Sequence, residues 1–190
     1  MKRTLLAVAL LTAGCPGWKD RAGYMKAHDQ HTDHLTVYRD LANVLTLHGT
    51  YLSPSFREAI AAERRRLLAP TDEAHDRYVR ILTDDGEAYH EVVFTAESVM
   101  VLAPELRFGE SDAGWHIRLE ADGVIQPLVT VFQIDPPTAV QRAIYAQSNE
   151  FNTLWMARFE RVTREPARVV LKVGSGYGHG ELSWGGTALR

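Results

Sequence analysis

Three histidines lie close together near the amino terminus, at His28, His31 and His34. Imidazoles with carboxylates nearby are the usual ligands of zinc or copper in an exported protein. The spacing of the three histidines argues against a shared metal site. On a helix their rings would spread over about 120°, and on a strand His31 would face away from the other two. We interpret the segment as a solvated linker, with a metal site formed by these three residues as the alternative.

A glycine-rich stretch near the carboxyl terminus, residues 174–180, has the composition of a phosphate-binding loop. A dinucleotide-binding loop opens a helix, and a P-loop needs Gly-Lys-Ser/Thr. This stretch lacks that triplet and is followed by the strand-like residues 181–184. It therefore predicts a hairpin loop and no nucleotide site.

Carboxylates that could form a catalytic pair occur at Asp84, Asp85 and Asp112, but turn formation explains each of them. The sequence contains no Gly-x-Ser-x-Gly elbow and no His-Glu-x-x-His motif, and it has a single cysteine. We therefore lean against an enzyme and assign no catalytic residue. A hydrolase acting on an envelope polymer is the third interpretation.

The amino terminus has the organisation of an export signal. A positive pair precedes an apolar run and small residues, namely Lys2-Arg3, residues 4–11 and Ala13-Gly14, and the cysteine Cys15 follows. A transmembrane helix needs about 20 apolar residues, whereas the apolar part of a signal peptide has about 7–15. The run is therefore expected to be part of a signal peptide.

This order of residues resembles the lipobox of bacterial lipoproteins, in which the cysteine thiol receives a diacylglycerol and the signal is cleaved just before it. The resemblance departs from the usual pattern at Thr12, where the family most often has Leu. It implies that residues 1–14 are a signal peptide and that Cys15 carries the lipid, with palmitate among its acyl chains. Pro16 replaces the aspartate that retains some lipoproteins in the inner membrane, which favours the outer membrane.

Residues 15–33 show no sustained apolar period, so we expect a lipidated tether there and a single domain over residues 34–190. Two helices are predicted within residues 54–83, where apolar residues recur at helical spacing. Ser55 and Glu58 have the spacing of a capping box at the start of the first helix. The helical pair is therefore expected as an insertion in the domain.

A period of two dominates the rest of the chain. Strands are predicted near residues 34–38, 44–52, 89–95, 115–120, 124–134, 152–162, 168–173 and 181–184. The clearest alternation places Trp115, Ile117 and Leu119 on a buried face. Short strands with turns between them predict a mainly β fold, an antiparallel β-sandwich that is immunoglobulin-like in outline, with the helical pair inserted.

The composition and net charge of the chain limit the classes of partner that it is expected to bind. The chain is 45% hydrophobic and 24% charged, as in a folded domain, and its formal net charge is −3. A mildly acidic chain without a long basic run does not favour nucleic acid, whose non-specific binding depends on phosphate neutralisation. We therefore expect the membrane, through the lipid, and an envelope protein as partners.

The stretches 49–57 and 181–184 are also loosely similar to small uncharacterised lipoproteins of proteobacteria, a resemblance that implies no activity. We therefore expect a membrane-anchored, non-catalytic binding or adaptor module of the bacterial cell envelope, facing the periplasm. The alternative is a metal-binding lipoprotein that uses His28, His31 and His34. We expect no cofactor beyond the covalent lipid, with zinc or copper as part of that alternative.

Overall fold

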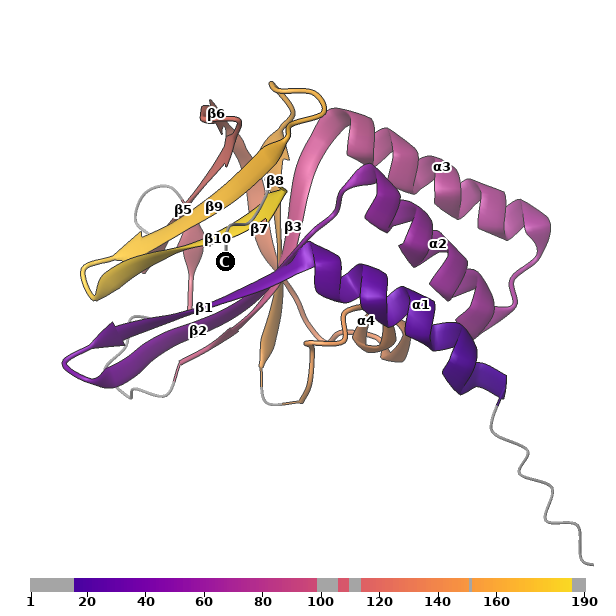
Figure 1. Cartoon of the computed structure of the whole chain (residues 1–190), viewed down its shortest axis with the longest axis horizontal. Coiled ribbons are helices and arrows are strands. Elements are labelled where there is room, and N and C mark those ends of the chain that lie inside the picture. Colours follow the sequence, from indigo (N-terminus) through magenta and orange to yellow (C-terminus); the bar gives the residue numbers. More distant parts are fainter. Residues whose placement is uncertain (1–15, 99–105, 110–113, 151, 186–190) are drawn as a thin grey trace, which may run out of the picture.

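The computed structural model describes residues 16–98, 106–109, 114–150 and 152–185, and it shows helices packed against two β-sheets (Figure 1). The helices are α1 Pro16–His31, α2 Pro54–Leu68, α3 Asp72–Ala88 and α4 Ala139–Ile144. The strands are β1 Thr32–Arg39, β2 Ala42–Tyr51, β3 Tyr89–Glu97, β4 Phe108–Gly109, β5 Trp115–Ala121, β6 Val124–Gln126, β7 Leu128–Ile134, β8 Thr153–Glu160, β9 Arg168–Ser175 and β10 Gly178–Gly185. Within these residues, none of the helices combines the length and apolar character that crossing a membrane requires.

The strands form two sheets, and the mainly β sandwich predicted from the sequence is confirmed. The first sheet has the order β1-β2-β3-β8-β7, and the second has the order β10-β9-β5-β4 with β6 paired to β5. All strand pairs among the described residues are antiparallel except β4 with β5. The chain enters the first sheet as a meander, because β1, β2 and β3 are neighbours in space as well as in sequence.

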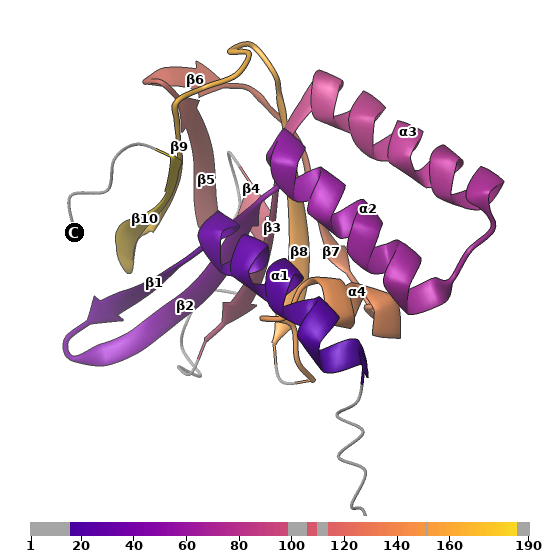
Figure 2. The ribbon, with the colours of Figure 1, turned by 45° about the vertical axis from the view of Figure 1, so that its right-hand side comes forward.

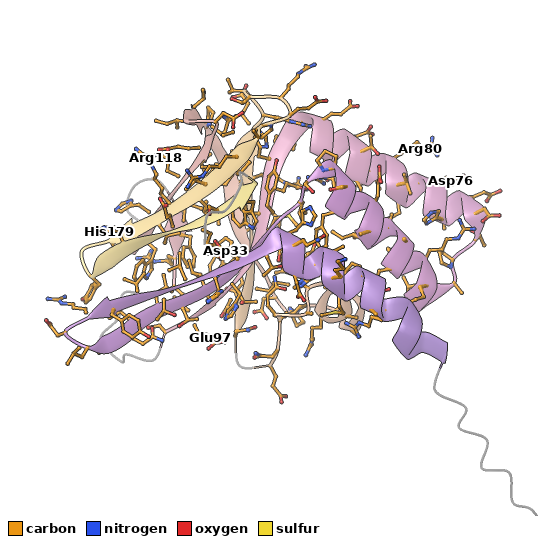
Figure 3. The ribbon with its side chains drawn as sticks, in the orientation of Figure 1. Asp33, Asp76, Arg80, Glu97, Arg118 and His179 are labelled. Carbon is orange, nitrogen blue, oxygen red and sulfur yellow. The ribbon has the colours of Figure 1, made fainter. Side chains whose placement is uncertain are left out.

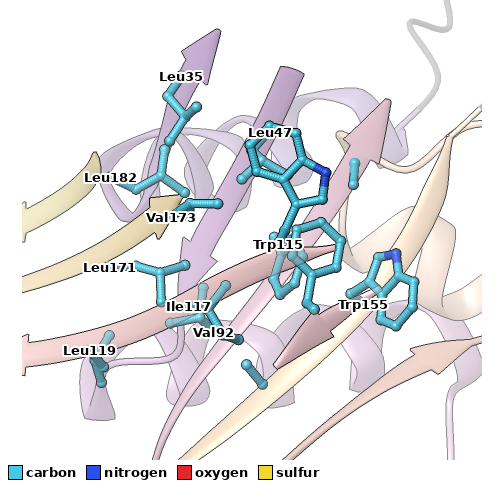
Figure 4. Close-up of a cluster of buried hydrophobic side chains, with 14 of the residues drawn as sticks. Leu35, Leu47, Val92, Trp115, Ile117, Leu119, Trp155, Leu171, Val173 and Leu182 are labelled. Carbon is cyan, nitrogen blue, oxygen red and sulfur yellow. The ribbon is translucent and has the colours of Figure 1, made fainter. Parts of the chain in front are cut away.

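The main core lies between the two sheets. Trp115, Ile117 and Leu119 of β5 are buried there, as their alternation predicts, and they face side chains such as Leu47 and Val92 of the first sheet (Figure 4). At one edge β10 approaches the β1–β2 hairpin, and the Ser183 backbone N–H donates to a carboxylate oxygen of Asp33 at 2.9 Å. The sandwich is therefore held together at this edge as well as through its core.

A second apolar cluster covers the opposite face of the first sheet. Tyr24 of α1, Phe56 and Ile60 of α2 pack there against Val93 of β3 and Leu154 of β8. Successive residues of a strand point to opposite faces, so β3 and β8 contribute to both clusters. The molecule therefore has three layers, helices, first sheet and second sheet, as Figure 2 shows.

The predicted helical pair is confirmed as α2 and α3, but the predicted cap of the first helix is wrong. Ser53 is the N-cap, and its hydroxyl accepts the Phe56 backbone N–H at 3.2 Å. Pro54 takes the first helical position, where its missing N–H costs nothing, so the cap must precede it. Ser55 lies inside the helix, two residues too late for the capping box expected with Glu58.

The tether expected over residues 15–33 is corrected by the structure, which places α1 and the start of β1 in this segment. The buried face of α1 consists of Tyr24 and His28, one turn apart, and it docks through polar groups. The Tyr24 hydroxyl donates to the Ile144 carbonyl oxygen at 2.6 Å. A helix that docks largely through such hydrogen bonds shows no apolar period in the sequence, which is why periodicity missed it.

The predicted turns are present. Asp122 and Gly123, between β5 and β6, both have positive φ, at 49° and 81°, as a type I′ hairpin turn requires. The glycine-rich stretch 174–180 connects β9 to β10 in an antiparallel hairpin. The predicted hairpin is present, but only residues 176 and 177 form its turn, and the rest of the stretch belongs to β9 and β10.

Candidate functional site

The outer face of the second sheet carries a row of polar side chains across three strands. In β5, β9 and β10 the apolar residues point to the core, so the alternate residues point outward. The strand register aligns His116, Gly174 and His179 in one row. Because the middle position has no side chain, the two imidazoles flank an open space above the sheet.

The adjacent row consists of Arg118, Lys172 and Glu181, in the same order of strands. Together the rows surround a groove of about 780 Å³, which Ile125 of β6 borders. In Figure 3, Arg118 and His179 lie at the end of the molecule opposite α3, which carries Asp76. None of the described helices covers this face, whereas the helical layer covers the outer face of the first sheet.

The charges in the groove are paired. Lys172 Nζ lies 2.7 and 2.8 Å from the two carboxylate oxygens of Glu120, and Arg118 Nη2 lies 3.0 Å from one of them. The hydrogen bond from Lys172 lowers the pKa of the Glu120 carboxyl, and the charge of Arg118 acts in the same direction. Glu120 is therefore ionised at neutral pH and suited to orient cations. It is not suited to act as a proton donor.

The side chains around the groove are suited to recognition by hydrogen bonds. The groove has exposed side chains that supply hydrogen-bond donors and acceptors and charges of both signs, namely His116, Arg118, His179 and Glu181. Among the described residues that line the groove, none is the serine or cysteine that nucleophilic catalysis would place beside a base. An extended polar ligand, such as a peptide segment of another protein, fits these features.

Gly174 controls the depth of the groove. A Cβ atom built on this residue would lie 3.6 Å from the Cβ of His179, which is ordinary contact. A small side chain is therefore tolerated, and a long one would project into the groove. Sequence reasoning placed Gly174 and His179 in a hairpin loop and did not recognise them as site residues. The signal that could have revealed them is the pairing of a glycine with histidines across neighbouring strands.

The histidines singled out from the sequence lie in three different environments. His28 is buried and donates through Nε2 to Oε1 of Gln147 at 2.7 Å. His31 stacks on Phe56 with ring centroids 5.1 Å apart. His34 lies exposed on β1. Among the described residues, no group of three His, Cys, Asp or Glu side chains is arranged to hold a metal ion.

The acidic residues and the cysteine singled out from the sequence do not meet at one place in the described structure. Asp85 pairs with Arg158, whose Nη2 lies 3.1 Å from its carboxylate, and Asp84 is exposed near the end of α3. Asp112 and Cys15 lie outside the described residues. The acidic residues therefore do not define a second candidate site.

A buried histidine at the other end of the sandwich is structural. The Tyr51 hydroxyl donates to Nδ1 of His90 at 2.8 Å, and Nε2 of His90 donates to the Thr163 carbonyl oxygen at 2.9 Å. Burial lowers the pKa of His90, and the charges of Arg161 and Arg57 lower it further. His90 is therefore a neutral link between β2, β3 and the segment after β8.

Comparisons with family models and with curated proteins do not assign the chain to a family or an activity. No protein-family model matches the chain, and a search of curated proteins finds no significant relative. The functional argument therefore depends on the residues and their geometry.

Proposed function

We propose that this chain is a lipid-anchored, non-catalytic binding module of the bacterial cell envelope, and that the groove over β5, β9 and β10 is its docking surface. One observation carries the docking part of the proposal: this sheet face is hollowed and lies outside the helical layer. Sheets of a sandwich usually expose one polar face to water, but a groove bordered by side chains of both charges gives that face recognition elements.

The proposed anchor, Cys15, directly precedes a helix that starts far from the groove. α1 begins at Pro16, immediately after Cys15, and in Figure 1 its amino-terminal end lies far from β9 and β10. α1 is fixed to the body, because Arg21 donates to the Ala143 carbonyl oxygen at 2.8 Å and His28 binds Gln147. A lipid on Cys15 would therefore hold the helical side toward the bilayer and direct the groove away from it.

A lipid anchor would favour a partner that is held at the same membrane. Two proteins held at one membrane meet at an effective concentration in about the mM range, so a weak contact in the groove is sufficient. With Pro16 after the cysteine, we propose the outer membrane as the site of anchoring and a periplasm-facing domain. Several acyl chains, at about 0.8 kcal/mol per buried methylene, give stable attachment, whereas a single chain gives reversible binding.

Site-specific photocrosslinking in the native cell tests the docking surface. A photoreactive residue replaces His179 in the groove or, as a matched control, Asp76 on the exposed side of α3 (Figure 3). We expect a discrete adduct from position 179 and none from position 76. Adding Gly174→Gln to the position 179 probe should remove the adduct, because the new side chain fills the groove, whereas Gly174→Ala should keep it.

Two outcomes would contradict the docking surface. The first is the same adduct from both probe positions, which would mean that the contact is not specific to the groove. The second is an adduct that Gly174→Gln leaves unchanged. Circular dichroism of each variant checks that the fold is intact.

A further inference from the structure

His34 and His48 form a pair on the first sheet, on the face that carries the helices and near the end of β1 that follows α1. The two residues are directly opposite in the β1–β2 register. Their ring centroids lie 5.9 Å apart, and the ring planes differ by 21°. His34 is exposed and His48 is half-buried, so a dissolved ion can reach the pair.

The backbone at His34 is held in place. Asp33 accepts the His34 N–H at one carboxylate oxygen, at 2.9 Å, and the Ser183 N–H at the other. These two hydrogen bonds fix β1 to β10 next to the histidine pair. The two imidazoles therefore project from a rigid part of the sheet, which favours a defined site over a chance contact.

The ring nitrogens of this pair are available, in contrast to those of His28, His31 and His90. His28, His31 and His90 each have a ring nitrogen within hydrogen-bonding distance of a protein group. Among the described residues, no group is hydrogen-bonded to the rings of His34 or His48. Two adjacent imidazoles with free nitrogens are the donors that Zn²⁺ and Cu²⁺ prefer.

A carboxylate stands on the next strand. Glu97 of β3 is opposite Thr46, and Thr95 is opposite His48, so Glu97 is the diagonal neighbour of His48 on the same face. Its charge raises the pKa of His48, while burial and the charge of His34 lower it. Glu97 is exposed and accepts a long hydrogen bond from the Asn152 side chain, at 3.4 Å, so rotation toward the pair exchanges this contact for the ion.

We propose that His34 and His48 chelate a divalent transition-metal ion, Zn²⁺ or Cu²⁺, with Glu97 as the third protein ligand and water completing the coordination. The three side chains do not surround a common point in the described structure, so binding requires rotation of the exposed His34 and Glu97. The site differs from the histidine set expected from the sequence, because only His34 is shared. It is independent of the lipid anchor and of the groove.

Calorimetric titration of ZnCl₂ and of CuCl₂ into the purified full-length chain, prepared without a histidine tag, tests this site. We expect saturable binding of one ion to the original protein and to the control His179→Ala, which removes an exposed histidine in the groove. His34→Ala and His48→Ala should each weaken binding by about 10-fold to 100-fold, by analogy with the loss of groups that support a metal site. Glu97→Gln should have a smaller effect. Cys15 is present in all these proteins, so its thiol cannot explain a difference between them.

Electron paramagnetic resonance of the Cu²⁺ adduct gives a second readout. The original protein should show coupling to two imidazole nitrogens, and His34→Ala should show coupling to one. His34 is exposed, so this variant is expected to fold, and it carries the test even if His48→Ala does not fold. The site would be overturned by absence of saturable binding, or by equal affinity in His34→Ala and the original protein.

Discussion

Arg57 and Glu91 form a buried ion pair, in which Nη2 of the arginine lies 2.7 Å from Oε2 of the glutamate and the side chains are 5% and 2% exposed. The remaining arginine donors bind the carbonyl oxygens of Leu52 and Leu82. Arg158 occupies the other oxygen of Glu91 at 2.6 Å. This cluster joins α2 and α3 to β3 and β8, so it fixes the helical layer to the first sheet.

Breaking the cluster should be costly. Glu91→Gln leaves the buried Arg57 guanidinium without its carboxylate, whereas the partly exposed Arg158 keeps Asp85. We expect the free energy of unfolding to fall by about 3–5 kcal/mol. The control is Glu120→Gln, which removes the partner of Lys172 on the groove surface and should cost about 0–1 kcal/mol. Denaturant unfolding of both variants measures this. Equal losses would show that the buried cluster does not fix the helices.

A pair of glycine substitutions tests the packing of the sandwich. A Cβ atom on Gly49 would lie 2.5 Å from Cδ1 of the buried Leu182, so Gly49→Ala forces the core to shift. We expect a loss of about 1–3 kcal/mol from this overpacking. Gly174→Ala meets only ordinary contacts and should change stability by about 0.5 kcal/mol or less. If Gly49→Ala is as stable as Gly174→Ala, the two sheets are not as close as the structure has them.

The docking of α1 can be tested at His28. His28→Ala removes the partner of Gln147 in a buried contact, and we expect a loss of about 1–3 kcal/mol. His34→Ala changes an exposed side chain and should stay within about 0.5 kcal/mol in metal-free buffer. Thermal unfolding of the two variants separates a docked helix from a loose tether. A tether would make the two substitutions equally harmless.

The buried His90 predicts a dependence of stability on pH. Burial lowers its pKa in the folded state, so the unfolded chain binds the proton more tightly. The stability that neutral His90 provides is complete above the unfolded pKa of about 6.5, and it is lost as the pH falls from there to the lower folded pKa. The lowered pKa of His48 acts in the same direction.

Unfolding of the original protein and of His90→Gln between about pH 7.5 and about pH 5.5 measures this. The variant should be less stable at the higher pH but should lose less stability on acidification. A variant that loses as much as the original protein would show that His90 does not cause the dependence.

The strands and turns could be predicted from the sequence because their cause is local. Trp115, Ile117 and Leu119 alternate with polar residues, and Asp122-Gly123 suits a type I′ turn, so each element is visible within a few positions. The N-cap is Ser53, two residues before the predicted Ser55, because the Ser-x-x-Glu spacing alone does not fix which serine precedes the first helical residue. The helix α1 was missed because its docking depends on residues such as Ile144 and Gln147, which lie more than a hundred positions away.

The groove and the histidine pair could not be predicted for a related reason. His116 and His179 become neighbours of Gly174 only through the registers of β5, β9 and β10. His34 meets His48 only through the register of β1 and β2. Sequence spacing suggested instead that His34 belongs with His28 and His31, because they are close in the chain.

The most direct test of the central proposal, a lipid-anchored module, is the intact mass of the protein extracted from native membranes. The account predicts a chain that begins at Cys15, without residues 1–14, and that is heavier than its amino-acid sequence by a diacylglycerol and an amide-linked acyl chain. A Cys15→Ala variant should show neither this cleavage nor the added lipid mass. A native protein that retains residues 1–14, or that is cleaved without added lipid, would contradict the account.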